Sequence, residues 1–130
     1  MAVYLDSCIV IYQTEEIEPW AGRLRLALAN LTTPDVVVSD LVRLECRVVP
    51  LRNGASELLE RFEMALSELT LAPLTSQVFD RAAELRARHR IKTPDALHLA
   101  AALEYGCEEF WTNDMRFASL PAEIVFRTFK

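Results

Sequence analysis

Residues 93–102 read TPDALHLAAA, and this stretch decides how the rest of the chain can be arranged. Thr93 is a good helix N-cap, Pro94 suits the first helical position and Gly106 is a good stop residue, so we predict a helix between them. Its residues are small or apolar on nearly every face, which is typical of a helix buried against a sheet. Asp95 falls in the first turn, where the helix dipole favours a carboxylate. A charged side chain is therefore expected at the N-terminus of a buried helix.

Short apolar runs on both sides of this helix predict buried strands. Strands alternating with helices predict a parallel α/β sheet covered on both faces. No repeat, low-complexity segment or linker marks a second unit, so residues 1–130 are expected to form one domain. We expect strands over residues 2–5, 36–38, 69–74, 109–112 and 124–126, and further helices over 9–12, 19–31, 39–50, 56–69 and 76–89.

Local signals mark the ends of the helix that follows the second strand. Ser39 is expected to cap its start, and Pro50 is expected to end or kink it. The helix carries the apolar residue Leu44 beside Glu45 on its predicted stripe. Asn53-Gly54 is a turn signal, here between two helices because no strand flanks it.

Four acidic residues lie close to the carboxyl ends of the expected strands. Asp6 directly follows the first strand, and Asp114 lies just past the fourth. Asp95 opens the helix before the fourth strand, and Glu45 lies nearly two turns into the helix after the second. The functional crevice of a parallel α/β sheet lies at the carboxyl ends of its strands. We therefore expect all four acids at one end of the sheet, although Asp95 taken alone is better explained as an ordinary helix-start residue.

Four gathered carboxylates repel one another and raise one another's pKa. Hard divalent cations resolve that repulsion, because Mg²⁺ and Mn²⁺ take oxygen ligands and share carboxylates with substrate phosphates. One or two such ions can activate water and stabilise the charge that develops on a phosphodiester. The sequence contains no Ser–His–Asp or Cys–His arrangement for covalent chemistry, so the acids are expected to carry the reaction.

Composition limits the other classes of function. The net charge of −5 gives no general nucleic-acid-binding surface, although setting the four acids aside leaves the rest near neutral. Cys8, Cys46 and Cys107 are odd in number and lack C-x-x-C spacing, which argues against disulfides and a zinc site. With His89 and His98 as the only histidines, a soft-ligand metal centre is not expected. No signal peptide or membrane-spanning run is seen, so a cytoplasmic location is expected.

The acids and their surroundings resemble a known family. Leu5-Asp6-Ser7, a helical Glu45, the TPDALHLAA block at 93–101 and Thr112-Asn113-Asp114 together resemble a PIN-domain protein of the VapC toxin type. The resemblance covers essentially the whole chain, in the right order. It implies a three-layer α/β/α sandwich around a mainly parallel sheet.

The resemblance also implies a function. Such proteins cleave RNA with Mg²⁺ or Mn²⁺, so the implied partners are an RNA substrate, a small antitoxin and a second copy in a homodimer. Carried over residue by residue, Asp6, Glu45, Asp95 and Asp114 match the catalytic, metal-binding positions. Thr112 matches a hydroxyl position that supports the fourth acid. Two other classes stay open: a non-catalytic PIN-like binding module, and an aspartyl-nucleophile phosphatase, which would want a second Asp where Cys8 stands.

Several other residues carry two interpretations. His98 lies one turn beyond Asp95, and a satisfied structural histidine is the preferred interpretation over a base or ligand. Cys8 and Cys46 are expected to be inert small core residues. The basic run over residues 86–92 is either a solvated helix end or a contact for phosphate or a partner. Arg116 and Asn113 stand close enough to Asp114 in sequence to reach a bound phosphate.

Overall fold

The computed structural model describes residues 1–117, 120 and 123–130. Within them the centre is a five-stranded sheet in the order β3-β2-β1-β4-β5, and each pairing is parallel. The predicted parallel sheet is therefore confirmed, with the first strand at its middle. The strands are β1 (Ala2–Leu5), β2 (Asp35–Val38), β3 (Thr70–Leu71), β4 (Glu109–Trp111) and β5 (Val125–Arg127).

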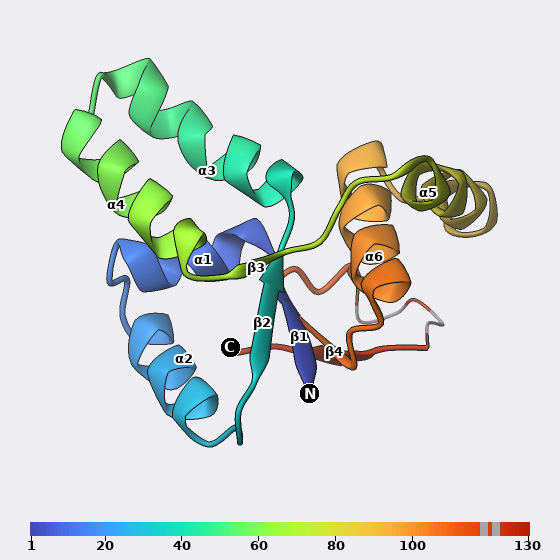
Figure 1. Ribbon diagram of the computed structural model, residues 1–130, viewed down its shortest axis with the longest axis horizontal. Coiled ribbons are helices and arrows are strands. Elements are labelled where there is room, and N and C mark those ends of the chain that lie inside the picture. Colours follow the sequence, from blue (N-terminus) through green and yellow to red (C-terminus); the bar gives the residue numbers. More distant parts are fainter. Residues whose placement is uncertain (118–119, 121–122) are drawn as a thin grey trace.

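Helices cover both faces of this sheet. In Figure 1, α1 and α2 lie on one side and α5 and α6 on the other, which gives the three layers that the sequence predicts; α3 and α4 pack together as a hairpin that projects beyond the sheet. Among the described residues, no helix is both long and apolar enough to cross a membrane. The helices are α1 (Ser7–Thr14), α2 (Trp20–Ala29), α3 (Asp40–Asn53), α4 (Ser56–Ser67), α5 (Ser76–His89) and α6 (Thr93–Tyr105).

The core is built around β1 and α6. Val3, Tyr4 and Leu5 are at most 1% exposed, because layers on both faces bury successive side chains of the strand. On α6, residues 98–102 are all buried, as expected of a helix that is apolar almost all round. Gly106 ends α6 with a φ of 91°, a left-handed conformation that favours glycine. The central stretch of the sequence thus forms the predicted buried helix.

The start of α6 differs in detail from the prediction. Lys92, not Thr93, occupies the N-cap position, and it makes no side-chain cap. The Thr93 hydroxyl instead accepts a hydrogen bond from Arg86 Nη1 at 2.9 Å, while Arg86 Nε donates to the carbonyl of Ile91 at 3.0 Å. Within the basic run, Arg86 therefore ties the α5–α6 connection together. The contact that the remaining basic residues make with phosphate or a partner stays a prediction.

The helix α3 departs from two local predictions. Ser39 occupies its N-cap position but makes no side-chain cap hydrogen bond. Pro50 lies inside the helix, which continues to Asn53, so the prediction that Pro50 ends the helix is wrong and the alternative of a kink stays a prediction; the residue is buried. Gly54 then ends α3 in a left-handed conformation, which confirms the turn signal.

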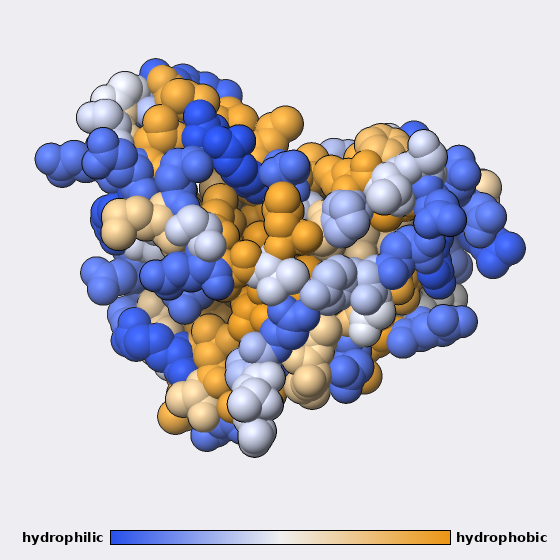
Figure 2. Space-filling model, in the orientation of Figure 1, coloured by the Kyte–Doolittle hydropathy of each residue, from blue (hydrophilic) through white to orange (hydrophobic). Residues whose placement is uncertain are grey.

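The apolar stripe predicted on α3 is on the wrong face. Leu44 is 57% exposed, whereas Val42, Cys46 and Pro50 are the buried residues of this helix. Apolar residues occupy more than one face of α3, so periodicity alone does not say which face packs inward. In Figure 2, apolar surface is visible between the α3–α4 hairpin and the part of the molecule that carries α6. The rotation of α3 that buries Cys46 also directs its neighbour Glu45 toward the sheet end described below.

Candidate active site

The four predicted acids lie in one pocket. Asp6, Glu45, Asp95 and Asp114 all line a cavity of about 350 Å³, together with His98 and five other residues. The pocket lies where β1 and β4 end and where α6 begins, the edge of a parallel sheet at which ligands bind. The predicted gathering of these side chains is therefore what the structure shows.

Asp6 is held by both of its carboxylate oxygens. Oδ1 accepts a hydrogen bond from the Ser7 backbone N–H at 2.8 Å, which makes Asp6 the N-cap of α1 and starts that helix earlier than predicted. Oδ2 accepts from the Thr112 hydroxyl at 2.7 Å, and the same hydroxyl oxygen accepts the Asp114 backbone N–H at 3.0 Å. Thr112, which the resemblance assigned to support the fourth acid, thus fixes Asp6 and Asp114 together.

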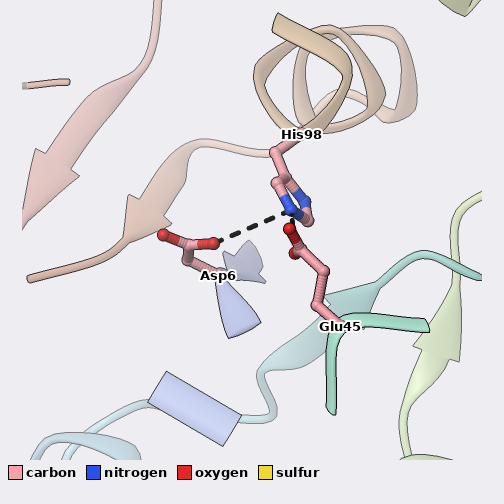
Figure 3. Close-up of side chains that lie close together, drawn as sticks. All are labelled: Asp6, Glu45 and His98. Atoms are coloured by element: carbon pink, nitrogen blue, oxygen red, sulfur yellow. Dashed lines mark hydrogen bonds and ion pairs between the residues drawn. The ribbon is translucent and has the colours of Figure 1, made fainter. Parts of the chain in front are cut away.

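Glu45 and Asp6 face a histidine. His98 Nε2 lies 2.6 Å from Glu45 Oε1 and 3.9 Å from Asp6 Oδ1 (Figure 3). We call these three residues the histidine cluster. Burial opposes ionisation of Glu45, but the hydrogen bond and charge of His98, with a further hydrogen bond from Ser7, outweigh it and lower the pKa of Glu45. Glu45 is therefore a carboxylate, and His98 Nε2 carries the proton between them.

A buried chain of hydroxyl groups holds the other side of the His98 ring. Nδ1 lies 2.8 Å from the Tyr4 hydroxyl, which in turn lies 2.8 Å from the Ser39 hydroxyl. Burial raises the pKa of Tyr4, so its phenol keeps its proton. Nε2 faces the Glu45 carboxylate, and the Tyr4 hydroxyl lies within hydrogen-bond distance of both Nδ1 and the Ser39 hydroxyl. Ser39 thus orders a site residue instead of capping α3.

A second basic residue joins the remaining two acids. Arg116 Nε lies 3.0 Å from both carboxylate oxygens of Asp114, and Nη2 lies 3.4 Å from Asp95 Oδ2. We call these three residues the arginine cluster. The hydrogen bond from Arg116 holds the pKa of Asp114 below its usual value. Burial raises the pKa of Asp95, with Arg116 opposing that effect and neighbouring carboxylates adding to it.

The site therefore differs from the bare group of repelling acids that the sequence suggests. His98 lies between Asp6 and Glu45, and Arg116 lies between Asp95 and Asp114. His98 hydrogen-bonds Glu45 and Arg116 hydrogen-bonds Asp114, while Asp6 and Asp95 lie within ion-pair distance of these bases, so the protein itself offsets part of the repulsion before any ion binds. The carboxylate form of Asp95 stays unfavourable, chiefly because the side chain is partly buried, as the raised pKa of its carboxyl indicates.

His98 and Arg116 were only partly anticipated from the sequence. His98 is 2% exposed and hydrogen-bonded at both nitrogens, which confirms a satisfied buried histidine, but its partner is a predicted site acid. The spacing of His98 one turn beyond Asp95 was a signal that it faced the pocket. Arg116 pairs with Asp114 two residues away, and its contact with a phosphate stays a prediction. Nothing in the sequence pairs Glu45 with a histidine 53 positions later.

Two cysteines lie beside these acids. Cys46 is buried, as predicted, whereas Cys8 is only partly buried and lines the pocket, with its sulfur 3.8 Å from Asp6 Oδ2. Burial and the charge of Asp6 raise the pKa of Cys8 to about 11, so it stays a thiol near neutral pH. An aspartyl-nucleophile phosphatase needs a carboxyl group two residues after its nucleophile, and a thiol is a poor replacement for it. The pocket therefore does not favour the phosphatase alternative.

The donor chemistry of the pocket fits a divalent cation. Asp6, Glu45, Asp95 and Asp114 offer carboxylate oxygens, the ligands that Mg²⁺ and Mn²⁺ prefer. The three ligand atoms of the histidine cluster lie within 4.8 Å of one another, which is close enough to share one ion after small movements. Asp6 is also ordered by Thr112, as carboxylate ligands of metals commonly are.

The family follows from comparison with known sequences. The model of the PIN domain matches residues 3–123, and the chain therefore belongs to the PIN domain family. That match covers all four acids and both bases of the pocket. A search of curated protein sequences found no match.

Solved structures share the fold. VapBC2 from Rickettsia felis, bound to a DNA fragment from its promoter, has a TM-score of 0.81 at 17% identity, with 100% of each chain covered. A toxin–antitoxin complex from Klebsiella pneumoniae has a TM-score of 0.76 at 23% identity, with 95% of each chain covered. VapC20 from Mycobacterium tuberculosis, a toxin that cleaves the sarcin–ricin loop, has a TM-score of 0.70 at 18% identity, covering 95% of this chain and 98% of that one. At these identities the likeness establishes a common fold.

Proposed function

We propose that this protein is a metal-dependent endoribonuclease that hydrolyses RNA phosphodiester bonds and acts as the toxin of a type II toxin–antitoxin pair. PIN-domain toxins of the VapC kind are typically ribonucleases, which sets the general class. The observation that carries the proposal is the convergence of Asp6, Glu45, Asp95 and Asp114 in one pocket at the carboxyl end of the sheet. We propose these four residues as both the catalytic and the metal-binding residues.

The proposed metal ligands are ordered by different elements of the fold. A bound Mg²⁺ or Mn²⁺ would supply a Lewis acid for the phosphoryl oxygen and lower the pKa of a water molecule. Asp6 is fixed by Ser7 and Thr112, so its carboxylate needs little ordering when it binds an ion. Asp95 lies in the first turn of α6, whose N-terminus also attracts phosphate groups. Asp6 and Asp95 are thus the proposed core ligands, with Glu45 and Asp114 at the sides.

Arg116 is the proposed contact for the RNA backbone. Its side chain is 61% exposed at the rim of the pocket, next to Asp114 and Asp95. Guanidinium groups bind phosphate through paired hydrogen bonds, much as they bind carboxylates. When its two acids take part in binding an ion, Arg116 is positioned to turn toward a phosphate of the substrate.

A cleavage assay with matched variants tests the enzyme. The wild-type protein is incubated with structured RNA that contains single-stranded loops, in Mg²⁺ or Mn²⁺ and separately in excess EDTA. We expect cleavage only with metal, and at least a hundredfold loss in Asp6→Asn or Asp114→Asn. Asp80→Asn, an exposed acid on α5 outside the pocket, is the control and should cleave normally. Undiminished cleavage in EDTA would overturn the proposed mechanism.

The toxin assignment requires its own experiment. The proposed partners besides RNA are a small inhibitory antitoxin, encoded next to this chain, and a second copy of the protein in a cytoplasmic homodimer. Expression should arrest growth, the neighbouring gene product should relieve the arrest, and Asp6→Asn should be harmless. An active nuclease whose expression does not slow growth would remove the toxin assignment and leave the enzyme.

A further inference from the structure

We infer that Asp6, Glu45 and His98 form a binding site for a transition-metal ion of the zinc class. The site combines one imidazole nitrogen with two carboxylate oxygens, and these ligand atoms lie within 4.8 Å of one another. Imidazole suits Zn²⁺ and similar ions, whereas Mg²⁺ is bound by oxygen ligands. The histidine cluster therefore differs in chemistry from the all-carboxylate set proposed for hydrolysis, although it shares two of its residues.

The distances within the cluster are close to those of a ligated ion. Two atoms bound to a tetrahedral Zn²⁺ at its usual bond lengths lie about 3.4 Å apart. His98 Nε2 is 2.6 Å from Glu45 Oε1 and 3.9 Å from Asp6 Oδ1, so one separation is too short and the other too long. The Glu45 side chain is 31% exposed and has room to withdraw, and a small shift brings Asp6 closer. Small movements of Glu45 and Asp6 thus bring the ligand atoms to the spacing of a bound ion.

The surroundings of the cluster resemble those of a metal site. A histidine that binds a metal usually donates its second ring N–H to a neighbouring acceptor, and a carboxylate ligand is itself hydrogen-bonded. His98 Nδ1 faces the Tyr4 hydroxyl at 2.8 Å, and Asp6 Oδ2 accepts from Thr112 at 2.7 Å. The ring of His98 is 2% exposed and so is held in one orientation, with Nε2 directed at the two acids (Figure 3).

The hydroxyl chain leaves His98 Nδ1 with a hydrogen-bond partner when Nε2 binds an ion. In the metal-free protein Nε2–H donates to the Glu45 carboxylate, and Nδ1, the Tyr4 hydroxyl and the Ser39 hydroxyl form one hydrogen-bonded chain. Binding through Nε2 needs its lone pair, so the Nε2 proton leaves to solvent, and the proton that the bound imidazole carries is on Nδ1 and is donated to Tyr4. The Tyr4 hydroxyl proton then turns toward Ser39, which each hydroxyl permits because it both donates and accepts.

Occupation by Zn²⁺ has a consequence that rests on the proposed function. The ion would hold Asp6 and Glu45, two of the residues proposed for the Mg²⁺-dependent reaction. Zn²⁺ should therefore inhibit RNA cleavage, and excess Mg²⁺ should compete poorly because it gains nothing from the nitrogen ligand. RNA cleavage would then depend on the concentrations of both Zn²⁺ and Mg²⁺.

The two histidines allow a direct test on the wild-type protein. With histidine labelled by ¹⁵N, NMR reports the tautomer and ligation of His98, and His89 on α5, outside the pocket, is the internal reference. One equivalent of Zn²⁺ should shift the Nε2 resonance of His98 and place the proton on Nδ1, with His89 unchanged. Mg²⁺ should not ligate either ring. Zn²⁺ that leaves the His98 resonances in place overturns the inference.

Affinity measurements with variants give an independent test. Zn²⁺ affinity is measured by competition with a chromophoric chelator, and circular dichroism checks that each variant is folded. We expect at least tenfold weaker binding in His98→Gln and a tenfold or larger loss in Tyr4→Phe, which keeps the ring and removes the hydroxyl. His89→Gln should bind as the wild type does. Equal affinity in folded His98→Gln would refute the site, and if that variant is unfolded the NMR measurement decides.

The outcomes separate this inference from the proposed function. Metal-dependent cleavage with no ligation of His98 by Zn²⁺ removes the zinc-class site and leaves the nuclease. Ligation of His98 without any RNA cleavage in Mg²⁺ or Mn²⁺ supports the site and removes the nuclease.

Discussion

Arg116 Nη2 lies 3.4 Å from Asp95 Oδ2, so the protein's own guanidinium group lies between two acids of the pocket, Asp95 and Asp114. The same guanidinium pairs with Asp114, which lies on the segment after β4. An ion that binds these carboxylates has to compete with the arginine. Within the arginine cluster, Arg116 thus supplies the counter-charge, and Asp95 and Asp114 are the potential metal ligands.

Replacing Arg116 with Gln should strengthen metal binding. With the competing guanidinium gone, Mg²⁺ should bind several-fold more tightly, as measured by isothermal titration calorimetry. The metal-free variant should melt at a lower temperature near neutral pH, because Asp114 loses the partner that lowers the pKa of its carboxyl. In the wild type that contribution is present above the usual Asp pKa and is lost as the pH falls through the lowered one. Arg88→Gln, an exposed arginine on α5, is the control, and Mg²⁺ affinity equal in both variants would contradict the competition.

Replacing Asp95 with Asn should stabilise the metal-free protein. The pKa of Asp95 is raised on folding, chiefly by burial, so its ionised form opposes folding at neutral pH. In EDTA at pH 7 the variant should gain on the order of 1 kcal/mol, and the gain should shrink as acid protonates Asp95 in the wild type. Thermal melts with and without Mg²⁺ measure both effects. Added Mg²⁺ should raise the wild-type midpoint more than that of the variant.

The alternative role of Asp95 makes the opposite prediction. If Asp95 only favours the start of α6, Asn should serve almost as well, and the substitution should be neutral or slightly destabilising. The response to Mg²⁺ would then be the same in both proteins. A wild-type midpoint that is indifferent to millimolar Mg²⁺ and Mn²⁺ would remove the main physical support for a four-acid metal site.

Replacing Thr112 with Val should destabilise the protein and disorder the pocket. Thr112 is fully buried, and its hydroxyl both donates to Asp6 and accepts the Asp114 backbone N–H. Valine keeps the shape but leaves both groups short of a partner, which costs about 1–3 kcal/mol in urea denaturation. Thr112→Ser keeps the hydroxyl and is the matched control. If the two variants lose the same stability and the same Mg²⁺ affinity, the hydroxyl is not what holds the carboxylates.

Replacing Gly106 with Ala should lower stability without changing the pocket. Gly106 ends α6 with a φ of 91°, and an alanine there is strained although a Cβ would meet no atom within 4 Å. The loss should be about 1 kcal/mol in urea denaturation, with Mg²⁺ affinity and RNA cleavage per folded molecule unchanged. A gain in stability would show that the left-handed conformation is not required.

The arrangement of the acids was predictable from the sequence because it follows from local order and topology. Short apolar runs mark β1 and β4, and residues that come directly after parallel strands meet at one edge. Asp6 and Asp114 are therefore placed by chain order alone. Asp95 is placed by the Pro and Gly signals that bound α6.

The bases were harder to predict because their partners depend on how helices rotate against the sheet. His98 meets Glu45 across the packing of α6 and α3, and only the inward face of α3 directs Glu45 that way. The sequence offers two apolar faces on α3, and the exposed Leu44 shows that the wrong one was chosen. Thr93 likewise lost its capping role to a tertiary contact with Arg86. Local propensity decides such details only where no distant partner competes.

The central position of β1 ties completion of the acid pocket to the order in which the chain is made. This strand is synthesised long before its neighbour β4, which begins at Glu109, and pairings so distant in sequence form slowly. The hydroxyl that fixes Asp6 belongs to residue 112. A nascent chain or a fragment that ends before that point has no complete acid pocket, so we expect the pocket to form in one late step of synthesis.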